Sequence, residues 1–282
     1  MSGVFEQMLA KYDLSTTTAR RNATYEVMQQ IVLAGLQRGG FFYKAAFYGG
    51  TCLRIFHGLQ RFSEDMDFTL LNGSDRFNLE NYFPAVVNEF KALGRDVTIT
   101  KKEKKNFGKV ESAFLKDDTE VYNISFRTEK SLKIKIEVDT DPPLGFQTEQ
   151  KLLMQPFSFM TRCVVLPDLF AGKMHALVFR TWGKRVKGRD WYDFEWYVRN
   201  EIPLNFEHLQ QRTKAFNGMD LTCGEFMKLL NERLSTTDIS LVKHDVEPFV
   251  KNRDELAVWS NDYFLQLVRR IRFQQAPPKA AD

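Results

Sequence analysis

The sequence predicts an α+β protein, in which a mixed, mostly antiparallel sheet flanked by helices is followed by a helical region. Three observations support this class. Segments with the two-residue period of strands alternate with helical segments up to residue 166, and helical periodicity dominates after Pro167. Hydrophobic residues make up 43% of the 282 positions and charged residues 27%, as in ordinary globular proteins. We expect one domain over residues 1–166, a second over 167–275, and a disordered tail over 276–282.

The first region begins with a helix and then alternates strands and helices. Apolar residues at helical spacing predict a helix over residues 20–40, which Gly39 and Gly40 end. A buried strand over 41–48, a helix over 51–57, a second strand over 61–71 and a helix over 79–93 follow. β-Branched and aromatic content predicts four further strands, at Val97–Thr100, Val110–Phe114, Val121–Arg127 and Leu132–Asp139.

The second region shows helical periodicity throughout. Its pattern predicts five helices, at Asp168–Trp182, Asp190–Val198, Phe206–Phe216, Gly224–Leu234 and Glu255–Phe273. The length and composition of the whole chain therefore suit a two-domain protein with a sizeable core.

Composition and patterning exclude several classes of protein. No apolar run approaches the roughly 18 residues that a membrane-spanning helix needs, and the N-terminal residues lack a secretory pattern, so we expect a cytoplasmic protein. Cys52, Cys163 and Cys223 are far apart without CxxC spacing, which indicates buried thiols and neither disulfides nor a zinc site. The net charge of +4 does not by itself identify a nucleic-acid binder.

Two carboxylates on the second expected strand are the first candidates for chemistry. Asp65 and Asp67 lie two residues apart, so they share one strand face at a distance where their charges repel unless a cation lies between them. Mg²⁺ is commonly held by one or two carboxylates together with substrate phosphates. The pair predicts a Mg²⁺ site for phosphoryl or nucleotidyl transfer, with a solvated strand edge as the alternative.

A glycine turn precedes these carboxylates. Gly49, Gly50 and Thr51 follow an expected strand and open an expected helix, where exposed backbone N–H groups and the helix N-terminus favour an anion such as a triphosphate. The alternative is a tight turn with Thr51 as the helix N-cap. Because the glycine turn and the carboxylates occupy consecutive elements, we favour a nucleotide site.

A third carboxylate would complete a two-metal arrangement. Glu137 and Asp139 lie on the polar face of a later strand, and we favour Glu137, with Asp139 as the alternative metal ligand. The same polar face also suits simple solvation.

The helical region adds cations and two further carboxylates. Lys173 and Arg180 are seven residues apart on one expected helix, so both can neutralise a triphosphate. A basic connection containing Lys187 and Arg189 follows, with Trp182 and Trp191 as candidates for stacking on RNA, although basic loops are often only solvated. Asp190 and Asp193 share one helix face. Asp190 as a helix cap and Asp193 as a partner of Arg189 are the alternatives.

These blocks together resemble the AbiEii/AbiGii-type toxins, a branch of the DNA-polymerase-β-like minimal nucleotidyltransferases. The run GGTCLRIFHGLQRFSEDMDF carries the family's first motif, with Gly49, Gly50, Arg61, Ser63, Asp65 and Asp67 at its positions. The strand LKIKIEVD resembles the second motif, and Lys173, Arg180 and the run RDWYD at 189–193 resemble the later ones.

The resemblance implies a polymerase-β-like fold and an enzyme that transfers a nucleoside monophosphate from an NTP, with tRNA as the acceptor. It also implies a cognate antitoxin and a role in growth arrest or phage defence. By this analogy Asp65 and Asp67 bind Mg²⁺, Gly49, Gly50, Thr51, Arg61, Ser63 and Arg180 contact the nucleotide, Lys173 contacts the triphosphate, and Asp190 or Asp193 assists catalysis or positions the helix.

Two other functions fit the same residues. Nucleotidylation of a protein or a small molecule uses the same chemistry on another acceptor. A non-catalytic module could instead keep the nucleotide pocket and act through a partner. We favour the NTP:RNA nucleotidyltransferase toxin because the carboxylates, the glycine turn and the cations occur in the expected order.

Overall fold

The computed structural model describes residues 3–73, 76–101, 119–126, 132–180 and 186–274. The chain divides into two compact units: the first comprises Met1–Leu144 and Thr148–Val164, and the second comprises Gly145–Gln147 and Val165–Asp282. The expected strand Val110–Phe114, the expected tail at 276–282 and Trp182 lie outside the described residues. Each unit is considered by itself below.

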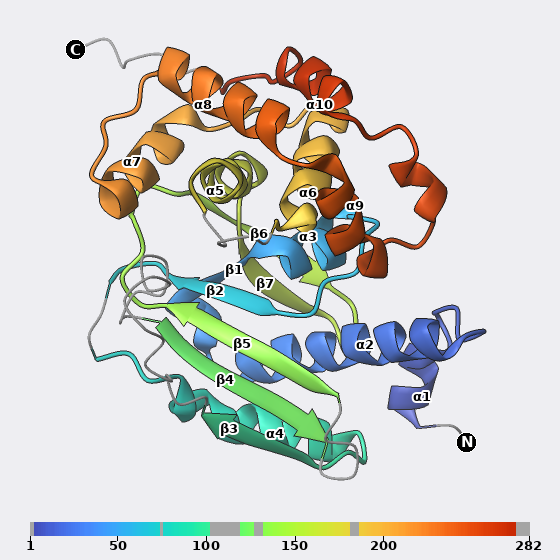
Figure 1. The fold of residues 1–282 in the computed structure, drawn as a ribbon. Coiled ribbons are helices and arrows are strands. Elements are labelled where there is room, and N and C mark those ends of the chain that lie inside the picture. The colour runs from blue at the N-terminus through green and yellow to red at the C-terminus, as the bar shows by residue number, and fades with distance from the viewer. Residues whose placement is uncertain (1–2, 74–75, 102–118, 127–131, 181–185, 275–282) are drawn as a thin grey trace. The chain divides into compact units, whose positions relative to one another are not determined.

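The first unit is built on one sheet, in which the described residues form seven strands in the order β3-β4-β5-β2-β1-β7-β6 (Figure 1). Four of the strand pairs are antiparallel, while β2–β5 and β1–β7 are parallel, which confirms the prediction of a mixed, mostly antiparallel sheet. The strands are β1 (Ala45–Tyr48), β2 (Met66–Leu70), β3 (Val97–Lys101), β4 (Thr119–Phe126), β5 (Lys133–Asp139), β6 (Thr148–Leu153) and β7 (Phe159–Val164).

Helices and short turns flank this sheet, as the sequence predicts. The helices of the first unit are α1 (Val4–Leu9), α2 (Thr17–Arg38), α3 (Gly49–His57) and α4 (Phe83–Ala92), with 3₁₀ turns at Phe41–Tyr43 and Leu79–Tyr82. The side chain of Thr16 caps α2 by accepting a hydrogen bond from the Ala19 N–H at 3.0 Å. α2 packs against α4 and contacts β5 and β7, so it links both halves of the sheet (Figure 1).

Phenylalanine, which occurs 25 times in the sequence, builds much of the core of this unit. Phe68 on β2 lies 5.0 Å from the ring centroids of both Phe41 and Phe47. All three side chains have no exposed surface. Aromatic pairs at this separation add to the burial of apolar area, so β1 and β2 are anchored close to the glycine turn and to Asp67.

Two predicted strands begin later than expected. The strand expected over 41–48 begins at Ala45, because Gly40 adopts a left-handed φ of 77° and a 3₁₀ turn follows it. The strand expected over 61–71 begins only at Met66. Residues 61–65 form no strand, and the carbonyl groups of residues 62–65 accept hydrogen bonds from side chains on α2, on α3 and within the segment itself.

The second unit is helical, and its described residues form α5 (Leu166–Phe179), α6 (Gly188–Arg199), α7 (Phe206–Asn217), α8 (Cys223–Thr236), α9 (Ile239–Val246) and α10 (Asn261–Val268), with 3₁₀ turns at Glu247–Phe249 and Arg253–Leu256. α5 packs against α6, α7 and α8. Phe170 on α5 stacks on Tyr197 of α6, with the ring centroids 4.4 Å apart.

None of the helices in the described part of the chain is long and apolar enough to cross a membrane.

Two helix predictions in this unit are wrong in extent. The helix expected over 168–182 ends at Phe179, and the Arg233 side chain donates hydrogen bonds to the Val178 and Arg180 carbonyls at its end. The helix expected over 255–273 is broken, because Ser260 caps α10 by accepting a hydrogen bond from the Tyr263 N–H at 3.0 Å.

Candidate active site

The glycine turn between β1 and α3 is shaped by close packing against three polar side chains. Gly49 has a φ of 80°, a left-handed value that costs most residues with a side chain about 1–2 kcal/mol. A β-carbon at Gly49 would lie 2.5 Å from Oδ2 of Asp67, and one at Gly50 would lie 2.6 Å from Nη2 of Arg61 and 2.9 Å from Oγ of Ser63. Gly49, Gly50, Arg61, Ser63 and Asp67 are therefore brought together, as the sequence blocks suggested.

Thr51 is not the N-cap of α3, which is Tyr48. Its hydroxyl lies in the first turn of the helix and is fully buried. Thr51 Oγ1 contacts Oγ of Ser63 at 3.0 Å and donates to the carbonyl oxygen of Asp65. The side chain thus connects the glycine turn to the residue that carries the first candidate carboxylate.

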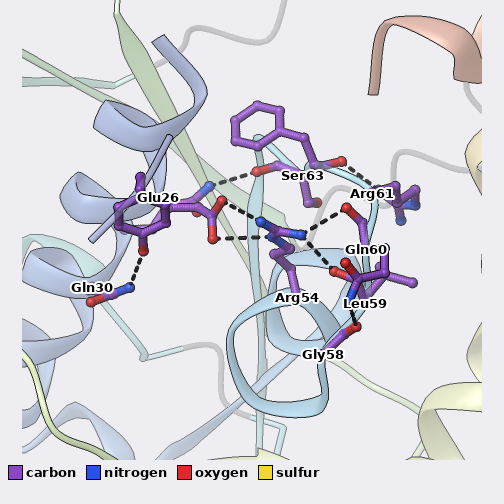
Figure 2. Close-up of polar contacts among 11 residues, drawn as sticks. Glu26, Gln30, Arg54, Gly58, Leu59, Gln60, Arg61 and Ser63 are labelled. Atoms are coloured by element: carbon purple, nitrogen blue, oxygen red, sulfur yellow. Dashed lines mark hydrogen bonds and ion pairs between the residues drawn. The ribbon is translucent and has the colours of Figure 1, made fainter. Parts of the chain in front are cut away.

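The segment between α3 and β2 is held by side chains (Figure 2). Arg54 Nη1 donates to the carbonyls of Leu59 and Gln60 at 3.0 and 2.8 Å, and Arg61 Nη1 donates to that of Phe62 at 3.0 Å. The Gln29 amide on α2 donates to the carbonyls of Ser63 and Glu64 at 2.9 and 3.0 Å. Because these carbonyls are satisfied by side chains, residues 61–65 do not need a strand partner.

The candidate carboxylates lie at the start of β2 and on the neighbouring strand β5. Asp65 directly precedes β2, and the parallel register places Asp67 opposite Glu137 and Thr69 opposite Asp139. Glu137 forms an ion pair with Lys135, whereas Oδ1 of Asp139 accepts a hydrogen bond from the Asp141 N–H at 3.2 Å. The register therefore brings Glu137 nearer to Asp67 than Asp139 is.

Lys135 shares the polar face of β5 with Glu137 and Asp139, so its residue type and spacing alone do not distinguish it from a solvated lysine. Burial lowers the pKa of its ammonium, but the carboxylates of Glu137, Asp65 and Asp67 together raise the pKa above its ordinary value. The Lys135 ammonium therefore interacts electrostatically with all three carboxylates. This arrangement indicates that the negative charge of the cluster is high enough to attract a positive partner.

The acids fit a divalent cation that also binds substrate phosphates. Within the described ranges, no group of three or more histidine, cysteine, aspartate or glutamate side chains is arranged to hold a metal ion. Asp65 and Asp67 nevertheless supply the hard oxygen ligands that Mg²⁺ takes when phosphate oxygens and water complete its shell. Such a site depends on the nucleotide for part of its coordination.

A second polar cluster lies inside the helical unit. The Lys173 ammonium on α5 lies 2.6 Å from Oδ1 of Asp190 and 2.8 Å from Oδ2 of Asp193, both on α6. The Asp193 side chain has no exposed surface, and that of Asp190 is 5% exposed. Both acids therefore share one helix face, and they bind Lys173; the sequence alternatives, a helix cap and a pair with Arg189, do not explain them.

Three cations surround the Asp190 carboxylate. Burial raises the pKa of this carboxyl group, but Lys173, Arg180 and Lys187 outweigh burial and lower the pKa to about 2. Burial lowers the pKa of Lys187 to about 8, and the charge of Asp190 opposes that change. Arg180 lies one residue past the end of α5, yet its charge still acts on Asp190.

Trp191 and Asp168, two other residues of this unit, have structural roles. Trp191 is 2% exposed and packs edge-on against Phe264 at 4.8 Å, so the suggestion that it stacks on RNA is wrong. Asp168 accepts hydrogen bonds from the Gln147 N–H at 2.6 Å and from Asn205 at 2.5 Å, which ties together backbone segments of this unit.

The cysteine prediction is confirmed in part. Cys52 and Cys163 are buried free thiols, as expected, but Cys223 is exposed.

The mixed sheet, the glycine turn and the adjacent acids together are typical of enzymes that transfer nucleotides, the nucleotidyltransferases. A family model described as the nucleotidyl transferase AbiEii toxin of type IV toxin–antitoxin systems matches residues 31–275. The chain therefore belongs to the AbiEii family of nucleotidyltransferase toxins. No curated protein matches the sequence.

Solved structures support the same fold. The nucleotidyltransferase toxin MenT4 from Mycobacterium tuberculosis superimposes with a TM-score of 0.58 at 14% identity, covering 94% of this chain and 87% of MenT4. JHP933 from Helicobacter pylori has a TM-score of 0.51 at 17% identity, covering 88% of this chain and 92% of JHP933. At these identities the likeness shows that the fold is shared.

Proposed function

We propose that this nucleotidyltransferase transfers a nucleoside monophosphate from an NTP to RNA, with tRNA as the first acceptor to test, in a Mg²⁺-dependent reaction. The observation that carries the proposal is the packing of Gly49 and Gly50 against Asp67, Arg61 and Ser63. It joins a turn suited to phosphate with an acid suited to a divalent cation. The family membership supports the same class of reaction.

Each residue of the first unit has a distinct role in this proposal. Asp65 and Asp67 would hold Mg²⁺ together with phosphate oxygens of the nucleotide, and Glu137, with Asp139 as the alternative, is the third acid proposed beside them. The bound ion supplies positive charge that neutralises phosphate oxygens. Gly49, Gly50 and Thr51 accommodate the triphosphate with backbone N–H groups, while Arg61 and Ser63 add a positive charge and a hydroxyl beside Gly50.

By analogy with the family motifs, Lys173 and Arg180 of the helical unit are the cations proposed to neutralise the triphosphate. Asp190 and Asp193 act by orienting the Lys173 ammonium, which both of them bind. A lysine held by two buried acids has little conformational freedom, so it suits a fixed contact with phosphate.

The RNA acceptor, the antitoxin partner and the cellular role are proposed from the likeness to the toxin family. Membership of a toxin–antitoxin family supports a cognate antitoxin. The motif resemblance is the ground for proposing tRNA as acceptor, the cytoplasm as the place of action, and a role in growth arrest or phage defence. The basic residues Lys187 and Arg189, which precede Asp190, offer positive charge to such an acceptor.

A transfer assay with the full-length protein tests the proposal. Purified protein is incubated with MgCl₂, each α-labelled NTP and total tRNA, and Asp65→Asn and Asp67→Asn are compared with Asp220→Asn, an acid whose side chain is 82% exposed. We expect label on RNA that both active-site variants abolish and the control retains. If the label appears on protein or on small molecules, these are the acceptors and RNA is not. If no NTP supports transfer, the proposal is contradicted.

A further inference from the structure

Residues 59–65, which lie between α3 and β2, have an unusual mode of support. Side chains donate hydrogen bonds to the carbonyls of Leu59, Gln60, Phe62, Ser63, Glu64 and Asp65. Figure 2 shows the bonds from Arg54 to Leu59 and Gln60. Strands hold such carbonyls through backbone partners, whereas these bonds come from Gln29, Thr51, Arg54 and Arg61. The position of the Asp65 main chain is therefore set by side chains on α2, on α3 and within the segment itself.

Of these donors, Gln29 lies furthest along the sequence from Asp65 and Asp67. It lies 34 residues before Ser63 and has no exposed surface, on a helix whose other side chains without exposed surface are apolar. Its amide nitrogen serves two successive carbonyls, while its Oε1 has no hydrogen-bond partner among the described residues. An amide placed in an apolar core is costly, and the two bonds that it donates are the reason the position suits glutamine.

Arg54 supports the other end of the segment. Its Nε and Nη2 bind the carboxylate of Glu26 at 3.1 and 2.9 Å, which leaves Nη1 for the carbonyls of Leu59 and Gln60. Glu26 and Gln29 are three residues apart, so they lie on the same face of α2. One face of this helix therefore reaches both ends of residues 59–65, as Figure 2 shows for the Glu26–Arg54 pair and for Ser63.

We propose that Gln29 and Arg54 are positioning residues for the Asp65 carboxylate, acting through the main chain of residues 59–65. The proposal rests on the function proposed above, because it assigns no new chemistry to Asp65. Both residues hold backbone carbonyls and leave the nucleotide to other groups. The family model begins at residue 31, so Glu26 and Gln29 also lie outside the part of the chain that it matches.

The test compares two glutamines that are neighbours on α2. Gln29→Met removes the two bonds to residues 63 and 64 at nearly constant volume. Gln30→Met is the matched control, because the Gln30 amide binds the hydroxyl of Tyr12 at 2.9 Å and leaves residues 59–65 unaffected. Arg54→Lys provides a second variant that keeps the charge beside Glu26 but loses the fork that reaches Leu59 and Gln60.

Three quantities are measured in the full-length protein: kcat and KM for nucleotide transfer, the Mg²⁺ concentration for half-maximal rate, and the thermal midpoint, with transfer assayed well below that midpoint. A shift of about 1 Å at a catalytic group can cost about 100-fold in rate. We therefore expect Gln29→Met and Arg54→Lys to lower kcat by about that factor and to raise the Mg²⁺ requirement, while Gln30→Met retains both. KM for the NTP should change far less than kcat.

The outcomes separate this inference from the proposed function. If Asp67→Asn abolishes transfer but Gln29→Met and Arg54→Lys change only the thermal midpoint, the two residues are merely structural and the inference is overturned. If Asp67→Asn retains transfer, the proposed site is wrong and the inference fails with it. Equal losses in Gln29→Met and Gln30→Met would also overturn the inference, because a general weakening of α2 would then explain both.

Discussion

Replacing Lys173 by methionine should destabilise the helical unit and make its stability depend on pH in a new way. The substitution keeps most of the volume of the side chain but removes the ammonium that lies 2.6 Å from Asp190 and 2.8 Å from Asp193. Both acids stay buried. The two carboxylates then lose the ammonium that both of them contact.

The magnitude follows from the cost of an uncompensated buried charge. Removing one partner of a buried ion pair typically lowers the unfolding free energy by about 3–5 kcal/mol. The pKa of Asp190, lowered from 3.8 to about 2, independently corresponds to about 2 kcal/mol for that acid alone. Because Asp193 also loses its contact with Lys173, we expect the variant to lose about 3–5 kcal/mol of unfolding free energy at pH 7.

Urea unfolding followed by tryptophan fluorescence measures this loss in one unit. All four tryptophans of the chain belong to the second unit, at positions 182, 191, 196 and 259. The lowered pKa of Asp190 stabilises the wild type above pH 3.8, and this contribution is lost as pH falls through about 2. Removing Lys173 raises that pKa, so the difference between variant and wild type should shrink from pH 7 to pH 4.

Lys214→Met is the matched control for this prediction. Lys214 pairs with Asp220 at 2.8 Å, but the two side chains are 69% and 82% exposed, so the loss should stay below about 1 kcal/mol. A loss below about 1 kcal/mol for Lys173→Met as well, or a difference that stays constant between pH 7 and pH 4, would refute the argument that the cluster is a buried charge network.

Two further predictions concern the same unit. A β-carbon at Gly188 would collide with the carbonyl of Val242, so Gly188→Ala should cost about 1–3 kcal/mol of unfolding free energy. A β-carbon at Gly224 would meet nothing within 4 Å, so Gly224→Ala should add about 0.4–1 kcal/mol. Equal effects of the two substitutions in urea unfolding would contradict this. Burial lowers the pKa of His175 and His208 to about 4, so the unfolded chain binds more protons below pH 6.5. Stability should therefore fall by about 2 kcal/mol per histidine between pH 7 and pH 5; a flat urea-unfolding profile over that range would rule out neutral buried imidazoles.

The sequence predicts most of the fold where periodicity is strong. β5 was expected because Ile134, Ile136 and Val138 alternate with polar residues, and all three are fully buried. β7 was not expected, because Thr161 occupies a fully buried position between Phe159 and Cys163 and so interrupts the apolar alternation. Periodicity describes which side chains are apolar, while a strand is decided by its backbone partners.

The candidate site was predictable to the extent that its residues lie close together in the sequence. Asp65, Asp67 and the two glycines belong to one block of twenty residues, and the structure brings the second glycine against Arg61 as well. Gln29 and Lys135 could not be found in this way. Gln29 acts on main-chain carbonyls, for which no side-chain pattern exists, and Lys135 looked like one of several exposed lysines on a polar strand face.

The fate of the labelled phosphate tests the central claim most directly, because nucleotidyl transfer keeps the α-phosphate of the NTP on the acceptor and releases the other two as pyrophosphate. The full-length protein is incubated with MgCl₂, total tRNA and one NTP labelled at the α- or the γ-phosphate. We predict that the α-label appears on the acceptor, the γ-label appears in pyrophosphate, and Asp67→Asn abolishes both. Transfer of the γ-label to an acceptor, or undiminished α-label transfer by Asp67→Asn, would contradict the assignment of the glycine turn and its neighbouring acids as the site of nucleotidyl transfer.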